Sequence, residues 1–306
     1  MEDVCGKKKP TVHQLDEITQ RVTSAFGKQI FHLRFHQKQE WFMRAKGAIV
    51  AAVTGNRWGK STAMVTTLLI AMLHCIPWAR REEQEELYER YSKLKPKFEP
   101  PIKAILCGPD FTSWVPQVVI PKLQELLPFA AVVTRTSRQQ GQVIDGLELF
   151  NGSSLKILSY AGETTRMESW DAHIVGWDEP PPADKFIAAS RGAIDRNSTH
   201  VMSFTPENLS DPWSYDAIYL PAHHIVDQRS FEEAMRDRPK IVVVRGSMRD
   251  NTFLDPEGIE SQLELWRKID PEVLAAREHG EYRHLAGRVY KSFSRERHVK
   301  ELEALV

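Results

Sequence analysis

Residues 54–62 read TGNRWGKST and combine glycines, a lysine and hydroxyl side chains in the manner of a phosphate-binding loop. In such a loop the backbone N–H groups surround the phosphates, a lysine reaches the terminal ones and a Ser or Thr hydroxyl binds Mg²⁺. Lys60 and Ser61 stand where this chemistry needs them. The usual spacing places a first glycine where this chain has Thr54, and Gly55 follows directly, which indicates a shifted turn.

The segments on either side decide between a phosphate loop and an ordinary surface turn. Residues 48–53 are apolar and partly β-branched, which predicts a strand, and residues 63–76 read as a buried helix. This apolar run is short for a membrane span and contains Thr66 and Thr67, so we expect no membrane association. A strand, a glycine turn and a helix are the context in which Gly-Lys-Ser predicts phosphate binding.

Two adjacent carboxylates, Asp178 and Glu179, end a second apolar strand predicted at 173–177. In nucleotide hydrolases the first carboxylate orients Mg²⁺ and the second polarises the attacking water. Because side chains alternate along a strand, neighbours can have separate tasks. An isolated Asp-Glu pair usually only caps a helix. After an apolar strand, and in a chain with a Gly-Lys-Ser loop, it predicts an ATPase with Glu179 as catalytic base.

Three further groups complete the expected site. Ser203 and Thr205, in the sequence SFTP, end the next predicted strand and would couple hydrolysis to movement, although Thr-Pro alone is merely a strand-ending turn. Arg57 lies inside the loop. Arg166 is either a surface arginine or a finger that reaches a neighbouring subunit's ATP. The predicted ATP contacts are Gln39, Thr54, Gly55, Asn56, Arg57, Trp58, Gly59, Lys60, Ser61 and Thr62.

Composition gives no global sign of nucleic-acid binding, because the 306 residues carry 41 basic and 41 acidic side chains. Any DNA contact must be local. Arg135 and Arg138, in a loop ahead of a predicted hairpin, are candidates, and ordinary solubility charges are the alternative. Three cysteines without metal-like spacing favour a reducing compartment. The lysines near the start precede no apolar segment, so no secretory signal is expected.

Strands alternate with helices along the chain, which predicts an α/β fold with a mostly parallel sheet covered on both faces. Residues 78–101 read as a charged, solvated helical insertion. After residue 246 the strands stop and helices take over, which predicts a small helical subdomain. The further expected elements are strands at 102–107, 200–204 and 241–245, a helix at 111–127 and a hairpin over 147–159 that turns at Asn151-Gly152.

Together these motifs resemble the large terminase subunits of tailed double-stranded DNA bacteriophages. The resemblance covers nearly the whole chain from residue 31. It rests on the segments HQKQEWF, TGNRWGKST, GETTRMESWDAHIVGWDEP, SFTP and RDNTFLDPEGIESQLELW…HGEYRHLAGRVYKSFSRERHV. The resemblance implies a P-loop NTPase fold of the RecA-like class with an additional catalytic glutamate (ASCE), and a helical lid. The implied divisions are a lead-in at 1–30, an ATPase core at 31–240, the lid at 241–286 and the start of a linker at 287–306.

The resemblance further implies a Mg²⁺-dependent ATPase that translocates double-stranded DNA into a procapsid. Its implied partners are the portal protein and the small terminase subunit. Its implied assembly is a homo-oligomeric ring, usually pentameric, and the isolated chain would be a monomer. Its implied location is the host cell cytoplasm. By position, the implied roles are phosphate or metal contact for Arg57, Lys60 and Ser61, metal assistance for Asp178, the base for Glu179, adenine contact for Gln39, coupling for Thr205 and a trans-acting finger for Arg166.

Members of that family continue into a nuclease domain, which would begin at the segment GRVYKSFSRERHV. Because the sequence stops at residue 306, we expect no nuclease activity from this chain, which is either a truncated piece or the product of a split gene. Two other functions remain open. A helicase-like translocase would unwind a forked duplex, and a non-catalytic nucleotide-binding scaffold would bind ATP without turnover.

Overall fold

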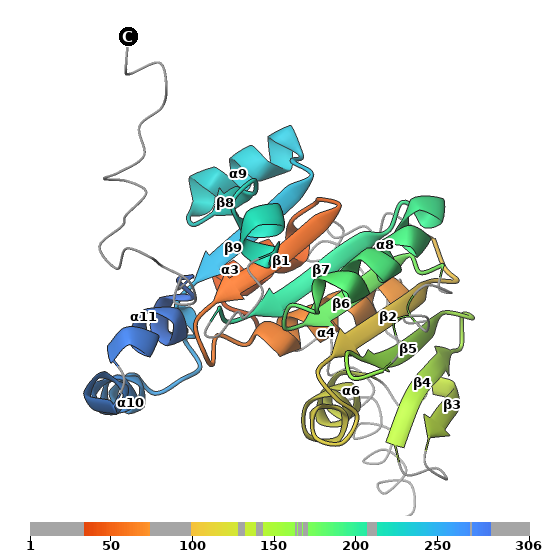
Figure 1. The fold of residues 1–306 in the computed structure, drawn as a ribbon, viewed down its shortest axis with the longest axis horizontal. Coiled ribbons are helices and arrows are strands. Elements are labelled where there is room, and N and C mark those ends of the chain that lie inside the picture. Colours follow the sequence, from red (N-terminus) through yellow and green to blue (C-terminus); the bar gives the residue numbers. More distant parts are fainter. Residues whose placement is uncertain are drawn as a thin grey trace, which may run out of the picture.

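Nine strands form one sheet in the computed structural model (Figure 1). The structure describes residues 34–73, 99–127, 132–138, 143–162, 164, 167, 171–206, 213–269 and 271–282. The strands are β1 (Ile49–Thr54), β2 (Lys103–Gly108), β3 (Val132–Arg138), β4 (Val143–Leu149), β5 (Ser154–Ser159), β6 (Ile174–Asp178), β7 (Thr199–Phe204), β8 (His223–Ile225) and β9 (Ile241–Gly246).

Helices connect most of these strands. The α-helices are α3 (Gln37–Arg44), α4 (Lys60–Leu73), α6 (Ile120–Leu126), α8 (Ala183–Arg196), α9 (Gln228–Asp237), α10 (Pro256–Ile269) and α11 (Pro271–His279). The shorter helices are the π-helical η2 (Val115–Val119) and η4 (Tyr215–Tyr219) and the 3₁₀-helix η5 (Met248–Asp250). Among the described residues, no helix is long and apolar enough to cross a membrane.

The sheet is mostly parallel, as the alternation of strands and helices predicts. Its strand order is β3-β4-β5-β2-β6-β7-β1-β9-β8, and only the β3–β4 and β4–β5 pairs are antiparallel. The predicted hairpin is confirmed, since β4 and β5 flank the turn at Asn151 and Gly152, where Gly152 has a φ of 77°. The predicted α/β class with a P-loop type sheet is therefore the observed one.

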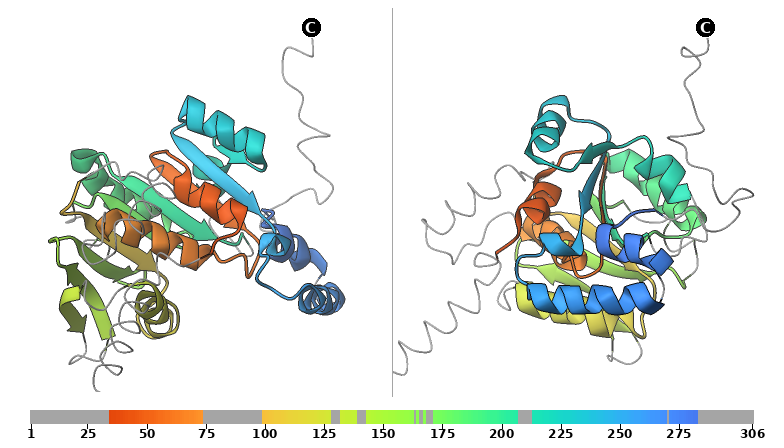
Figure 2. Two further views of the ribbon diagram at one scale, coloured as in Figure 1. Left: turned by 180° about the vertical axis from the view of Figure 1, so that it is seen from behind. Right: turned by 90° about the vertical axis from the view of Figure 1, so that its left-hand side faces the viewer.

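Successive residues of each central strand face two separate cores. In β1, Val50 and Ala52 pack with α3, α4, α6 and α9 on one face, whereas Ala51 and Val53 pack with α8 and η4 on the other. Figure 1 shows α8 in front of the sheet, and the reverse view in Figure 2 shows α3 and α4 on the opposite face. Burial on both faces is why these strands are continuous apolar runs rather than alternating ones.

Two expectations about local structure need correction. Arg135 and Arg138 lie in strand β3, paired antiparallel with β4, and not in a loop. The β-branched residues of 132–138 favour extended backbone, and the partner strand β4 supplies the hydrogen bonds. In addition, β9 pairs with β1 inside the sheet, although the expected boundary at residue 241 puts it in the helical subdomain. The predicted insertion at 78–101 lies outside the described residues, apart from its last three positions.

The helices that follow β9 form a small cluster at one end of the sheet. Met248, Ile259 and Leu263 make its apolar centre, and Leu254 and Trp266 pack around them. Figure 1 shows α10 and α11 beyond the carboxyl ends of β1 and β9. This position brings α11 into contact with the loop that follows β1.

Candidate active site

The predicted site residues meet at the carboxyl edge of the sheet. Thr54 ends β1 and Asp178 ends β6, while β7, which contains Ser203, lies between these two strands. The carboxyl edge is where open α/β sheets bind ligands. One strand, β7, separates the loop strand from the carboxylate strand, and Ser203 and Thr205 at its end contact Asp178 and the loop.

The loop from β1 to α4 has the compact conformation that phosphate binding needs. Arg57 has a φ of 59° and Gly59 a φ of 93°, so the backbone turns sharply before α4 begins at Lys60. Gly55 allows a close approach, because a Cβ atom there would lie 2.2 Å from the carbonyl oxygen of Glu278. Helix α4 begins at this loop, where the first N–H groups of a helix and the positive end of its dipole favour an anion.

The end of β9 and the chain segments that follow it hold this loop from outside. The N–H of Gly55 donates to the carbonyl of Gly246 over 2.9 Å, and the N–H of Asn56 donates to the carbonyl of Arg277 over 2.6 Å. The Asn251 side chain donates to the carbonyl of Arg57 over 2.6 Å. Three backbone positions of the loop are thus fixed by residues that come far later in the sequence.

Helix α3 supports the other side of the loop. The Gln39 side chain donates to the carbonyl of Gly59 over 3.1 Å and accepts from the N–H of His36 over 3.2 Å. The His36 ring contacts the carbonyl of Trp58 at 3.0 Å and lies edge-on to the indole, with 4.7 Å between ring centroids. Burial lowers the pKa of His36. Gln39 thus lies against the loop, and its role as an adenine contact stays a prediction.

The Lys60 ammonium connects the loop to the end of β7. It donates to the carbonyl of Gly55 over 2.9 Å and to the hydroxyl of Thr205 over 2.5 Å. The same hydroxyl lies 3.0 Å from the carbonyl of Thr54 and 3.1 Å from the side-chain oxygen of Asn56. Thr205 therefore contacts both the Lys60 ammonium and the loop backbone. A displacement of the lysine would change the hydrogen bonds of the Thr205 hydroxyl.

Three donors surround the buried carboxylate of Asp178. The Ser61 hydroxyl lies 3.1 and 3.3 Å from its two oxygens, the Ser203 hydroxyl donates over 3.0 Å and the Trp114 indole N–H over 2.7 Å. Hydrogen bonds to a charged acceptor are the strong ones. The carboxylate is thereby fixed in direct contact with the hydroxyl at the start of α4.

Glu179 has a left-handed backbone, with a φ of 68°. Its N–H donates to the carbonyl of Ser203 over 2.9 Å, and the Tyr160 hydroxyl lies 2.7 Å from its carbonyl and 3.1 Å from that of Asp178. Burial raises the pKa of Tyr160, so this hydroxyl remains a donor. Such an unfavoured conformation is typical of functional sites, and the Glu179 residue is half-buried at the sheet edge.

The oxygen donors at this edge have the chemistry that a magnesium ion takes. Ser61 offers a hydroxyl and Asp178 a carboxylate, in contact with each other. Within the described ranges, no group of three or more His, Cys, Asp or Glu side chains is placed to hold a metal ion. Mg²⁺ commonly keeps several waters and binds through one or two protein oxygens plus substrate phosphates, so this pair fits an ion that arrives with a nucleotide.

Other predicted residues have weaker structural support. The Arg57 side chain is exposed and Thr62 is half-buried in the first turn of α4. Arg166 lies outside the described residues. Arg135 is exposed on β3, at the far edge of the sheet from β1, and β3 is described at Arg138 only for its backbone.

Several site residues are not among the predicted contacts. Trp114 and Tyr160 contact the carboxylate strand from outside the quoted motifs, while His36 and Asn251 contact the loop from within quoted segments that assign them no role. Only the fold brings them together. The one available hint is the His36-to-Gln39 spacing, which matches a capping box at the start of α3.

Fold and site together define the class of a P-loop NTPase with an additional strand beside the loop strand and a glutamate directly after Asp178. Among solved structures, the chain is similar to a mutant of the large terminase ATPase domain of Thermus phage P74-26, with a TM-score of 0.55, 14% identity, and coverage of 84% of this chain and 97% of that one. No protein-family model and no curated protein sequence matches the chain.

A second similar structure is a large terminase from another thermophilic bacteriophage, with a TM-score of 0.54 and 14% identity. The match covers 86% of this chain and 57% of the larger protein. At such low identity the likeness shows the fold, which is the one found in large terminase ATPase domains. The fold class implied by the sequence motifs is confirmed.

Proposed function

We propose that this chain is an ATP-hydrolysing motor of viral genome packaging, which translocates double-stranded DNA into a procapsid. The observation that carries this proposal is the contact of Ser61, at the start of α4, with Asp178, at the end of β6, beside Glu179. The terminase-type fold around this pair supports the packaging role.

In the proposed reaction, water attacks the γ-phosphate of ATP in line with the leaving group. Glu179 orients that water and accepts its proton, and Lys60 with the N–H groups of the loop stabilises the phosphate charge. Ser61 and Asp178 would hold a Mg²⁺ ion, which supplies positive charge against the phosphates. A neighbouring subunit's Arg166 would add charge in trans.

The contacts of Thr205 support a role in coupling hydrolysis to movement. Its hydroxyl touches Lys60 and Asn56 in the loop, while its backbone continues β7. When the γ-phosphate attracts the lysine, the hydroxyl loses a partner, and the end of β7 can respond. Ser203 would have a companion role, since it contacts Asp178 from the same strand.

Glu179→Ala tests the catalytic assignment. The variant should keep ATP affinity, measured by titration of a fluorescent ATP analogue, while phosphate release falls by about 10²–10⁴-fold. Glu179→Gln is the matched control, because it keeps the side-chain volume and removes only the basic oxygen. Unchanged turnover in both variants would rule out Glu179 as the base.

Two other functions give different results in simple assays. A helicase-like translocase should separate the strands of a forked duplex in the presence of ATP, whereas a packaging motor should leave them paired. A nucleotide-binding scaffold should bind ATP with no turnover in either the isolated chain or an assembled ring. Turnover that depends on assembly is the outcome expected of the motor.

The proposed ring assembly, pentameric on the portal protein and supplied with DNA by the small terminase subunit, places Arg166 at a neighbour's site. Mixing Arg166→Ala subunits with Glu179→Ala subunits should restore part of the lost hydrolysis, because some interfaces then hold one intact half from each variant. Absence of rescue in a verified mixed ring would count against a finger in trans.

For DNA, the proposed contacts are Arg135 and Arg138 on the edge strand β3. Phosphate contacts depend on salt, so the double Ala variant should bind duplex DNA more weakly and with a shallower salt dependence. A double Ala variant of Arg229 and Arg236, on the exposed face of α9, controls for the loss of net charge. Equal affinities and slopes in all three proteins would refute this assignment.

A further inference from the structure

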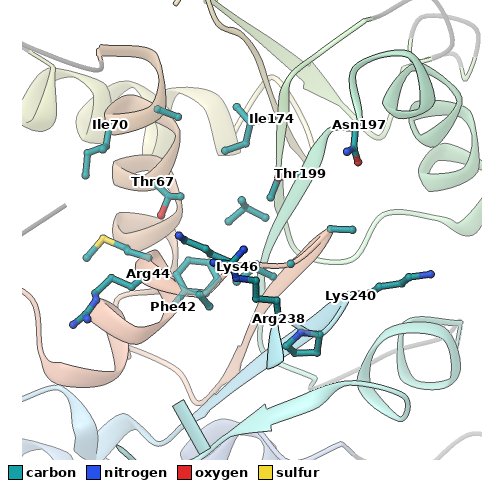
Figure 3. Close-up of a pocket in the computed structure, with 18 of the residues that line it drawn as sticks. Phe42, Arg44, Lys46, Thr67, Ile70, Ile174, Asn197, Thr199, Arg238 and Lys240 are labelled. Atoms are coloured by element: carbon teal, nitrogen blue, oxygen red, sulfur yellow. The ribbon is translucent and has the colours of Figure 1, made fainter. Parts of the chain in front are cut away.

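A cavity of about 510 Å³ lies at the amino edge of the sheet, at the opposite ends of the strands from the candidate active site (Figure 3). Its walls come from the ends of α3, α8 and α9, from the second half of α4 and from the starts of β1, β6, β7 and β9. The lining residues are Phe42, Met43, Arg44, Ala45, Lys46, Gly47, Ala48, Val50, Thr67, Ile70, Ala71, Ile102, Ile174, Asn197, Thr199, Val201, Arg238, Pro239 and Lys240.

The inner wall of this cavity is apolar. Phe42, Val50, Ile102, Ile174 and Val201 are all buried and present aromatic and branched side chains. A cavity of this volume with a mostly apolar wall is of the size and character that small-molecule sites have. A hydrocarbon or aromatic body placed there would gain the usual stabilisation of apolar surface removed from water.

Positive charge surrounds the apolar wall. Arg44, Lys46, Arg238 and Lys240 line the cavity, and no Asp or Glu is among the described residues that line it. In a chain with 41 basic and 41 acidic residues, four cations without a carboxylate are a local excess. The Nε atom of Arg44 is buried and has no hydrogen-bond partner among the described residues.

Helix termini do not account for this excess of charge. Cations often stand at helix carboxyl ends, and the ends of α3, α8 and α9 all face this region. Each end carries a partial charge of roughly −0.5, so three of them offset only about one and a half of the four positive charges. Among the described lining groups, an excess of roughly two and a half positive charges remains.

Arg238 stands where the backbone itself favours glycine. It caps α9 in the left-handed conformation, with φ 50° and ψ 58°, and its side chain lines the cavity. An L-residue with a long side chain is unfavourable there, and glycine is the usual choice. Figure 3 shows Lys46 and Arg238 at the centre of the lining residues, in front of Phe42, whereas Lys240 extends away from them.

We propose that this cavity binds a small amphipathic anion, a molecule with an apolar body and one carboxylate, sulfonate or phosphate group. The body packs against Phe42, Ile174 and Val201, and the anionic group pairs with Lys46 and Arg238. This inference does not depend on the proposed packaging function, because the cavity shares no residue with the candidate active site.

Fluorescence titration with anilinonaphthalene sulfonate tests the proposal, with uncharged phenylnaphthylamine as the matched probe of nearly the same apolar body. The sulfonate should bind at one saturable site and more tightly than the neutral probe. Arg238→Gly and Lys46→Gln should each weaken sulfonate binding by about tenfold, the size expected for loss of one charge-assisted contact. Both variants should leave the neutral probe unaffected.

Arg229→Gln is the charge control, since Arg229 is exposed on the same helix and does not line the cavity. It should leave both affinities unchanged. Arg238→Gly should also raise the melting temperature, because glycine fits the left-handed backbone, so weaker binding in that variant cannot be ascribed to unfolding. Octanoate should displace the sulfonate, and octanol should do so less well.

Three outcomes would overturn the proposal. They are equal affinity for the charged and neutral probes, equal losses in Arg229→Gln and Arg238→Gly, and binding of many sulfonate molecules without saturation. ATP-analogue binding, measured in the same variants, should match the unaltered chain. Loss of nucleotide binding together with loss of probe binding would show a general defect rather than a separate site.

Discussion

Because Glu179 has a left-handed backbone, we predict that the glycine variant is more stable than the alanine variant at this position, which is the reverse of the order in a helix. Both substitutions remove the carboxylate and whatever contacts it makes, so a comparison between the two variants isolates the backbone. In an exposed helix position, such as Glu264 in α10, alanine is more stable than glycine by about 1 kcal/mol. At residue 179, with a φ of 68°, the order should reverse.

The size of the reversal follows from two opposing terms. An L-residue in the left-handed conformation costs roughly 1–2 kcal/mol, which Glu179→Ala retains and Glu179→Gly relieves. Glycine loses about 0.5–1 kcal/mol through its greater freedom in the unfolded chain. The difference predicts that Glu179→Gly is more stable than Glu179→Ala by about 1 kcal/mol, while phosphate release is lost in both.

Urea denaturation followed by tryptophan fluorescence gives the two free energies of unfolding, and phosphate release gives turnover. The pair Glu264→Gly and Glu264→Ala, measured in the same way, should show the opposite sign in stability and normal turnover. A more stable alanine variant at residue 179 would refute the backbone argument. Normal turnover in the glycine variant would refute the functional one.

Three further changes have defined outcomes. Gly280→Ala should lower the melting temperature and weaken ATP-analogue binding, because a Cβ atom there would lie 2.5 Å from the backbone at the end of β1. Trp114→Phe keeps an aromatic ring, although a smaller one, and removes the indole N–H that contacts Asp178, so urea denaturation should show a loss of about 1.5–3 kcal/mol. Burial lowers the pKa of His200 to about 4, below the value of about 6.5 in the unfolded chain. Because only the unfolded chain takes up this proton between those pH values, the free energy of unfolding should decrease by up to about 3 kcal/mol as the pH is lowered from about 6.5 to about 4. His200→Gln should remove that part of the pH dependence.

Local signals in the sequence were sufficient for the elements of the central sheet. The strands β1 and β6 are short, continuous apolar runs that end at polar residues, and this pattern has few other interpretations in a chain with a Gly-Lys-Ser loop. The Asn151-Gly152 turn likewise predicts its hairpin from two residues. The edge strand β3 was missed, because TRTSR is polar and extended pairing with β4 decides its structure.

Contacts between distant segments set the rest of the site. Trp114 reaches Asp178 only because β2 and β6 are neighbours, and Asn251 reaches the loop only because β9 lies beside β1. Trp114 belongs to none of the quoted motifs, and the quoted segment that contains Asn251 does not indicate this contact. The place of β9 depends on the same kind of contact, since the sequence predicts this apolar strand but its neighbour in the sheet is set by its pairing with β1.

The distribution of strained backbone connects the two sites. Among the described residues, the non-glycine positions with positive φ are Arg57, Glu179, Asn197 and Arg238. The last two cap helices, a position where this conformation is common, although arginine is an unusual occupant. Arg57 and Glu179 cap no helix, and both lie at the carboxyl edge of the sheet. Their backbone conformations lower the stability of the fold, and such strain is typical of functional sites. If the strain is retained for chemistry, replacing Arg57 by Gly should raise stability and weaken nucleotide binding, whereas replacing Asn197 by Gly should raise stability alone. Equal nucleotide affinities in these two variants would show that the strain at Arg57 is only a property of the turn.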